Sequence, residues 1–114
     1  MSTKCIFCEI VRDPSSSVVV YRDDVVFAIH DINPRAPIHL LIIPVQHITA
    51  LSEMVGDDEL IPMHIARVAE EMAKRQGINE HGFRLVINQG KDAGQTIPHL
   101  HAHMIGGKLL GDMG

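Results

Sequence analysis

The stretch P-H-L-H-A-H-M-I-G-G, residues 98–107, places a histidine at every second position. Alternate side chains of a β-strand share one face, whereas the same spacing in a helix spreads them around the cylinder. The pattern therefore predicts a strand over 100–105 with imidazoles on one face: His99, His101 and His103. The opposite face is apolar and carries Leu100, Ala102 and Met104.

Other short apolar or β-branched segments, bounded by turn residues, predict four more strands: 18–22, 25–30, 38–44 and 83–88. The first two read as a hairpin about the tight turn Asp23-Asp24. The third is nearly continuous in its apolar residues, which suits the centre of a sheet.

The long helix is expected over 58–76, where apolar residues recur at helical spacing. Asp57 or Asp58 is its expected N-terminal cap, and Gly77 follows its last turn. A short helix is expected over 5–12. Three strands, a long helix and two further strands predict an α+β fold with a five-stranded antiparallel sheet, one long and one short helix.

Length and charge narrow the class of protein. A chain of 114 residues fits a single domain with one core. The net charge is -4 and no Lys/Arg block occurs, which argues against a nucleic-acid backbone as the main partner but not against a single nucleotide. With no membrane-length apolar run and no secretion signal at the start, a cytoplasmic location is expected.

Three explanations fit a face of three imidazoles. The first is ordinary packing, which suits single histidines such as His30, His64 or His81; three neutral rings on one face each need a partner for their polar nitrogens. The second is a metal site, because neutral imidazole is a common zinc ligand. The third is nucleophilic catalysis, in which one imidazole attacks phosphorus and forms a covalent intermediate.

Nucleophilic attack by an imidazole has two further requirements. One ring nitrogen must be free while a hydrogen bond to the other fixes the tautomer. Cations or N–H donors must also surround the phosphate oxygens. The glycine-bearing turn 90–94, followed by Gln95 and Thr96, could bring backbone N–H groups and a hydroxyl against a phosphate.

Cys5 and Cys8 form a C-x-x-C pair, a spacing that lets two thiolates bind one zinc ion. A tetrahedral site needs four ligands, and the missing two would most simply be histidines. A redox pair is the rival interpretation, although no thioredoxin-like βαβ pattern surrounds the cysteines. Two half-buried thiols without a metal are the third alternative.

Three segments together resemble the histidine triad (HIT) superfamily. H-L-H-A-H-M, preceded by G-Q-T-I-P, is similar to its H-x-H-x-H motif. Residues 30–47 are similar to its nucleotide-pocket segment, and V-I-N-Q-G (86–90) to the strand and turn that bring an Asn to the phosphate. The resemblance spans about residues 5–107 and is greatest to the Hint-like branch, in its zinc-binding bacterial-type variant.

This resemblance implies a single HIT domain over residues 1–114, with the HIT-like fold. It also implies a homodimer that hydrolyses purine nucleoside 5′-phosphoramidates, such as AMP-NH₂ or its N-alkyl derivatives. His101 would attack the α-phosphorus and become nucleotidylated. His103 would contact the phosphate or the leaving-group atom, and His39 would support the nucleophile. The phosphate oxygens or the bridging atom would be held by Asn88, Gln95 and Thr96.

The resemblance assigns the nucleoside and a metal as well. Asp31 would accept hydrogen bonds from the ribose hydroxyls. An apolar slot for the base would be lined by Phe7, Ile10, Ile29, Ile32 and Leu41. A structural zinc ion would be bound by Cys5, Cys8, His47 and His99. The chemistry at His101 itself would need no metal.

Two departures and one agreement bear on the substrate. Thr96 stands where the Hint branch usually has Ser, and its methyl group would narrow the leaving-group side. The chain has no Trp, whereas longer Hint members carry a Trp-containing C-terminal tail. His103, in place of a Gln, favours hydrolysis over nucleotide transfer. The alternatives are a dinucleoside polyphosphate hydrolase, a nucleotide-binding or scaffolding protein with negligible turnover, and a protein whose histidines bind zinc only.

Overall fold

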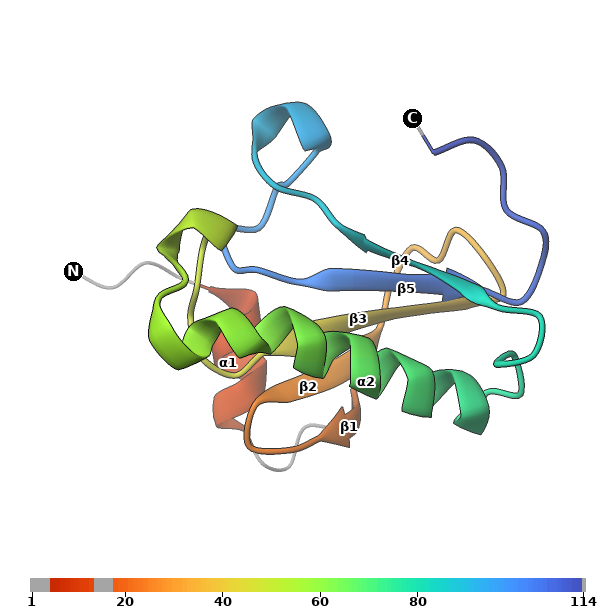
Figure 1. Ribbon diagram of the computed structural model, residues 1–114, viewed down its shortest axis with the longest axis horizontal. Helices are drawn as coiled ribbons and strands as arrows, with labels where there is room; N and C mark the ends of the chain where they lie inside the picture. Colours follow the sequence, from red (N-terminus) through yellow and green to blue (C-terminus); the bar gives the residue numbers. More distant parts are fainter. Residues whose placement is uncertain (1–4, 14–17, 114) are drawn as a thin grey trace.

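The fold is a five-stranded antiparallel sheet with one helix on each face, as Figure 1 shows for the computed structural model. The structure describes residues 5–13 and 18–113. The strands lie in the order β1-β2-β3-β5-β4. Their bounds are β1 Val19–Arg22, β2 Val26–His30, β3 Ile38–Pro44, β4 Phe83–Ile87 and β5 Ala102–Gly106. The predicted α+β class, the hairpin and the central position of β3 are confirmed.

Strand alternation divides the core between the two faces. The long helix α2, Ile61–Arg75, covers the face to which Leu40, Ala102 and Met104 belong. The short helix α1, Ile6–Arg12, packs Phe7 against the other face, beside Leu41 of β3. Side chains one residue apart therefore enter different cores. The imidazoles are on the α1 side of the sheet.

Three short 3-10 turns complete the chain: η1 Leu51–Glu53, η2 Gly56–Leu60 and η3 Lys91–Ala93. Because η2 leads directly into α2, the helix begins at Ile61, and its N-cap Leu60 makes no side-chain cap. The expected capping by Asp57 or Asp58 is therefore wrong. The other end agrees with the sequence, since Gly77 has φ 74° and its N–H bonds to the carbonyl of Lys74. Neither described helix is long and apolar enough to cross a membrane.

The last strand begins two residues later than expected, at Ala102. The backbone N–H of Leu100 donates to the carbonyl of Ile48 at 2.6 Å rather than to a neighbouring strand. The alternation of side chains nevertheless extends back through 100, because Leu100 is 1% exposed and packs in the α2 core. Only His103 of the three histidines is within a strand; His101 precedes it and His99 lies in a bend.

Candidate active site and metal cluster

The imidazoles gather on the α1 side of β3 and β5. The rings of His101 and His103 have centroids 5.2 Å apart, and His39 of β3 lies 5.2 Å from His103. Phe7 of α1 contacts the edges of both His99 and His101. The sheet thus brings together His39, from the middle of the chain, and the pair near its end.

His101 is held in one tautomer. Its Nδ1 lies 2.8 Å from the carbonyl oxygen of His99, and a carbonyl can only accept. The proton is therefore on Nδ1, which leaves Nε2 with a free lone pair. No described residue makes a hydrogen bond to that atom. This is the arrangement that a nucleophilic imidazole requires.

His39 and His103 form a second hydrogen-bonded unit. The backbone N–H of Arg35 donates to Nδ1 of His39 at 3.1 Å, so a neutral His39 carries its proton on Nε2. That Nε2 lies 2.9 Å from Nδ1 of His103 and 3.4 Å from Oδ2 of Asp31. Nδ1 of His103 is therefore an acceptor, and its own proton is on Nε2. A neutral His103 thus carries an N–H donor on Nε2, the ring nitrogen that does not bond to His39.

Burial keeps this pair uncharged. It lowers the pKa of His103 to about 4, and the neighbouring His101 and His39 add to the shift. Burial also lowers the pKa of His39, although the carboxylate of Asp31 opposes that effect. At neutral pH both rings are neutral hydrogen-bonding groups, because protonation would place a positive charge in a buried environment.

Asp31, His39 and His103 are also close enough together to hold a metal ion. The hydrogen bonds argue against one. A metal on Nε2 of His39 would need the proton on Nδ1, where the N–H of Arg35 already points. The unit therefore fits a hydrogen-bonded relay better than a metal site.

Asn88 and Thr96 have side chains free for a ligand: neither makes a side-chain hydrogen bond to another described residue. Asn88 follows β4, where Ile87 pairs with Ala102. Extending this register by one residue puts Asn88 opposite His101, on the imidazole face.

Gln95 differs, because its amide is already in use. Its two N–H groups donate to the carbonyls of Thr49 and Ile97, each at 3.3 Å. A phosphate oxygen needs a donor, and the described contacts of Gln95 leave none. The expected contact of Gln95 with phosphate would require one of these two hydrogen bonds to break.

The residues expected around the nucleoside differ in exposure. Phe7, Ile29 and Leu41 are buried in the α1 core, and Ile10 packs against them. Ile32 is 91% exposed, beside the half-buried Asp31. Oδ1 of Asp31 accepts the N–H of Asn33 at 2.8 Å, which fixes the carboxylate at the end of β2.

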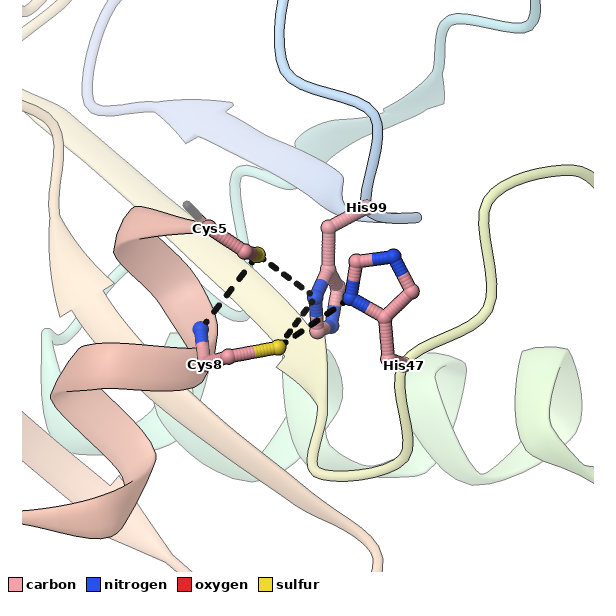
Figure 2. Close-up of side chains that lie close together, drawn as sticks. All are labelled: Cys5, Cys8, His47 and His99. Atoms are coloured by element: carbon pink, nitrogen blue, oxygen red, sulfur yellow. Dashed lines mark hydrogen bonds between the residues drawn. The ribbon is translucent and has the colours of Figure 1, made fainter. Parts of the chain in front are cut away.

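The second cluster joins four residues from three parts of the chain (Figure 2). Nδ1 of His99 lies 3.3 Å from Sγ of Cys5 and 3.6 Å from Sγ of Cys8. Nδ1 of His47 lies 3.1 Å from Sγ of Cys8. Sulfur and nitrogen ligands of a tetrahedral zinc ion lie about 3.6 Å apart, given Zn–S near 2.3 Å and Zn–N near 2.05 Å.

The tautomer of His99 also suits a metal. Its Nε2 lies 2.8 Å from the carbonyl oxygen of Pro44, so the proton is on Nε2 and the lone pair of Nδ1 points at the two sulfurs. A metal-bound histidine commonly donates its other N–H to a carbonyl in this way. The cluster Cys5, Cys8, His47 and His99 could therefore hold a metal ion.

Sequence reasoning missed the backbone groups that orient these rings: the carbonyls of Pro44 and His99 and the N–H of Arg35. Every residue has such groups, so no side-chain pattern identifies them. Only the Pro at 44 gives a faint signal, because it ends a buried strand with a carbonyl and no N–H.

The sheet and its row of imidazoles are those of a histidine triad protein. The chain belongs to the HIT domain family, whose model matches residues 12–109. The purine nucleoside phosphoramidase of Escherichia coli (strain K12) is 39% identical over 113 residues, which is 99% of this chain and 95% of that protein.

Two solved structures extend the comparison. A HIT family hydrolase from Clostridium thermocellum superposes with a TM-score of 0.89 at 42% identity and covers 99% of this chain and 98% of its own. A zinc-bound histidine triad family protein from Mycobacterium smegmatis has a TM-score of 0.74 at 30% identity, over 89% of this chain and 73% of its own.

Proposed function

We propose that this protein is a hydrolase of purine nucleoside 5′-phosphoramidates that acts through a nucleotidyl-histidine intermediate. The observation that carries the proposal is the hydrogen bond from Nδ1 of His101 to the carbonyl of His99, because it leaves Nε2 as a free nucleophile. Membership of the HIT domain family and 39% identity to a purine nucleoside phosphoramidase support this choice of substrate.

In the first step, Nε2 of His101 attacks the α-phosphorus and the P–N bond to the amine breaks. The electron pair of that bond leaves with the amine, which takes up a proton from the neighbourhood of Thr96 and His103. The N–H on Nε2 of His103 and the amide of Asn88 would hold phosphate oxygens as charge develops on them.

In the second step, water attacks the phosphorus of the nucleotidyl-histidine. The bond from phosphorus to Nε2 breaks and the ring nitrogen regains its lone pair. The proton that the water gives up returns to the neighbourhood of Thr96 and His103, which supplied one to the amine, and the nucleoside monophosphate is released. His39 acts through His103: its N–H holds Nδ1 of His103 as an acceptor and so keeps the proton of His103 on the side of the phosphate.

The nucleoside would lie across the end of β2. Asp31 would accept hydrogen bonds from the ribose hydroxyls. The exposed side chain of Ile32 would cover the base, whose other contacts are the apolar residues of the α1 core: Phe7, Ile10, Ile29 and Leu41. Burial of Ile32 by the base would remove a large apolar side chain from water.

The four-residue cluster would bind a structural zinc ion. Two thiolates and two imidazoles are a common zinc ligand set, and the geometry described above fits it. The ion would link α1 to the segments that bear His47 and His99, and no step of the chemistry passes through it. Because thiolate ligands persist in a reducing compartment, a cytoplasmic location suits the site.

We also infer a homodimer. In the described part of the chain, β4 has a strand partner on one side only, so its outer edge is free to pair with a second copy. The chain has a mass of 12.6 kDa. Light scattering of the purified protein should give twice that mass. A monomer at micromolar concentration would contradict this inference.

The first experiment measures AMP released from adenosine 5′-phosphoramidate by the wild type and by His101→Ala. We expect the variant to lose at least about a thousandfold in rate, because removing the nucleophile removes the covalent pathway. It should still fold and bind AMP. Turnover retained in the variant would overturn the assignment of the nucleophile. AMP binding without turnover by the wild type would favour a nucleotide-binding role.

A further inference from the structure

The loop 90–95, which directly precedes Thr96, is closed by the backbone and side chain of a single residue, Gln95. The N–H of Gln95 donates to the carbonyl of Gly90 at 3.1 Å. In return, Oε1 of Gln95 accepts the N–H of Gly90 at 2.9 Å. This reciprocal pair closes a six-residue loop, and Gly90 and Gly94 take the positive φ angles of 87° and 88° that the closure needs.

The same side chain docks the closed loop onto a neighbouring segment. One N–H of its amide donates to the carbonyl of Thr49 and the other to the carbonyl of Ile97, each at 3.3 Å. Thr96 stands between Gln95 and Ile97, so both of its neighbours in the chain are fixed. Its hydroxyl has no hydrogen-bond partner among the described residues, and Thr96 is an exposed residue.

The segment that receives the loop, 48–51, is itself well anchored. Along it, the carbonyl of Ile48 accepts the N–H of Leu100, and the N–H of Leu51 donates to Oε1 of Gln89 at 2.7 Å. Glu53 caps the segment through the backbone N–H groups of Thr49 and Ala50. Thr49 thus provides a rigid base for the loop.

We propose that Gln95 is a positioning residue that sets the Thr96 hydroxyl for proton delivery to the leaving group. This rests on the function proposed above, in which the departing amine takes up a proton beside Thr96. Gln95 itself touches no substrate in this scheme. Its three side-chain hydrogen bonds hold the backbone on both sides of Thr96.

The proposal differs in its consequences from a phosphate contact. A residue that holds the phosphate affects every substrate with the same phosphate. A residue that positions a proton donor matters only where the leaving group needs a proton. An alkylamine must be protonated to leave, whereas 4-nitrophenolate leaves as an anion.

The test compares two adenosine 5′-phosphate derivatives, an N-alkyl phosphoramidate and the 4-nitrophenyl ester, in single-turnover release of the leaving group. We expect Gln95→Ala to slow amine release by about 10- to 100-fold, a share of the usual general-acid contribution. Release of 4-nitrophenolate and the KM for both substrates should change less than about threefold. Equal losses with both substrates, or a raised KM with both, would overturn the proposal and indicate a phosphate contact.

A double-mutant cycle isolates the route through Thr96. If Gln95 acts only by placing that hydroxyl, Gln95→Ala should add nothing further to the loss in a Thr96→Val background. If the rate losses of Gln95→Ala and Thr96→Val multiply in the double variant, the proposal is overturned. Gln76→Ala, at the end of α2, removes the same side chain away from the site and serves as the matched control. Gln95→Glu keeps the acceptor for Gly90 but lacks both donors, and it provides a milder variant with an intermediate loss.

Failure of the proposed function is separable from failure of this inference. If the wild type cleaves neither substrate, the function is wrong. Amide hydrogen exchange then still tests the role of Gln95. Loss of its acceptor should speed exchange at Gly90 at least about tenfold and leave the amide of Leu100, bonded to Ile48, unchanged. Unchanged exchange at Gly90 would overturn the positioning role.

Discussion

At the scale of single residues, backbone groups decide what the imidazoles can do. The carbonyls of Pro44 and His99 fix the protons of His99 and His101, and the N–H of Arg35 fixes that of His39. Peptide groups do not titrate near neutral pH, so each ring keeps the same tautomer whenever it is neutral. His99 and His101, two residues apart, therefore keep different ring nitrogens unprotonated: Nδ1 in His99 and Nε2 in His101.

The stability of the fold should depend on pH through His103. Burial lowers its pKa to about 4, with His101 and His39 adding to the shift. Between that value and the ordinary value of 6.5, the unfolded chain binds a proton that the folded chain does not. Stability should therefore fall as pH drops from about 6.5 towards 4. In His103→Gln this part of the pH dependence should disappear, as measured by urea unfolding at a series of pH values.

The matched control is His81→Gln, at an exposed position away from the site. It should leave the slope of stability against pH between 4 and 6.5 as it is in the wild type. An NMR titration of the wild type should also find His103 neutral down to about pH 5. A midpoint near 6.5 would contradict the burial argument.

The chemistry of the site could be predicted from the sequence further than its geometry. The histidine row and the C-x-x-C pair indicated a site, because those residue types at that spacing have few uses. The resemblance to the HIT superfamily was needed to add His39 and His47 and to divide the histidines between metal and chemistry. The internal use of Gln95 could not be predicted. It depends on Thr49, which lies 46 residues away and has no motif of its own.

At the scale of elements, a polar cluster fastens the β1-β2 hairpin to α2. Asp23, in the turn, accepts the hydroxyl of Tyr21 at 2.7 Å and lies 2.8 Å from Nε2 of His64 on α2. It also accepts the backbone N–H groups of Val25 and Val26. Burial alone would raise the pKa of Asp23, but these hydrogen bonds outweigh it and lower the pKa to about 2.

Replacing Asp23 should loosen this hairpin. We expect Asp23→Ala to cost about 1.5–3 kcal/mol of unfolding free energy at pH 7, since it removes hydrogen bonds to a charged group. The carboxylate's contribution is present above about pH 4 and is lost as pH falls towards 2, so the variant should also show a shallower acid limb. Chemical denaturation at pH 7 and pH 3 measures both effects.

Asp24→Ala is the control, because Asp24 is the exposed neighbour in the same turn. It should change stability by less than about 0.5 kcal/mol, the usual range for surface positions. An equal loss in the two variants would show that the turn, rather than the bonds to α2, is responsible.

Element types could be predicted well and element ends less well. All five strands and both helices appear where periodicity and β-branched residues predict them. The predicted ends are wrong where the backbone at the end of an element bonds to another segment or forms a different kind of turn. The carbonyl of Ile48 accepts the N–H of Leu100, so β5 begins only at Ala102. Asp57 and Asp58 lie within the 3-10 turn η2, so neither of them caps α2. These element ends depend on contacts with other segments, which a local sequence pattern does not show.

At the scale of the whole molecule, the sheet separates stability from chemistry. The face under α2 is apolar and closed, with Ala102 and Met104 fully buried. The opposite face has α1 over one end and the imidazoles beside it. Substitutions under α2 should therefore affect stability alone, whereas changes on the imidazole face should affect activity, and changes at His103 or at the four-residue cluster should affect stability as well.

A zinc ion in the four-residue cluster should stabilise the whole fold. Purified protein should contain about one zinc per chain, and a chelator should lower Tm by at least about 10 °C, because a ligand at a thousand times its Kd adds about 4 kcal/mol. His47→Ala and Cys8→Ser should lose the metal and the stabilisation together. Metal analysis and calorimetry measure the two.

His101→Ala should keep the metal, because His101 is not among the four clustered residues. A second tightly bound zinc that depends on His101 would contradict the division between metal and chemistry. It would favour a protein whose histidines serve metal only.

The distance along the chain between the members of the metal cluster has a consequence for synthesis. Cys5 contacts His99, 94 residues later. During translation the two thiols leave the ribosome long before either imidazole partner, and the partner at 99 comes last. Until then the two thiols lack the imidazole of His99, which lies beside both of them in the folded chain. The cluster is therefore completed only once His99 has emerged, and a chain cut short before that residue would lack one of the four clustered groups.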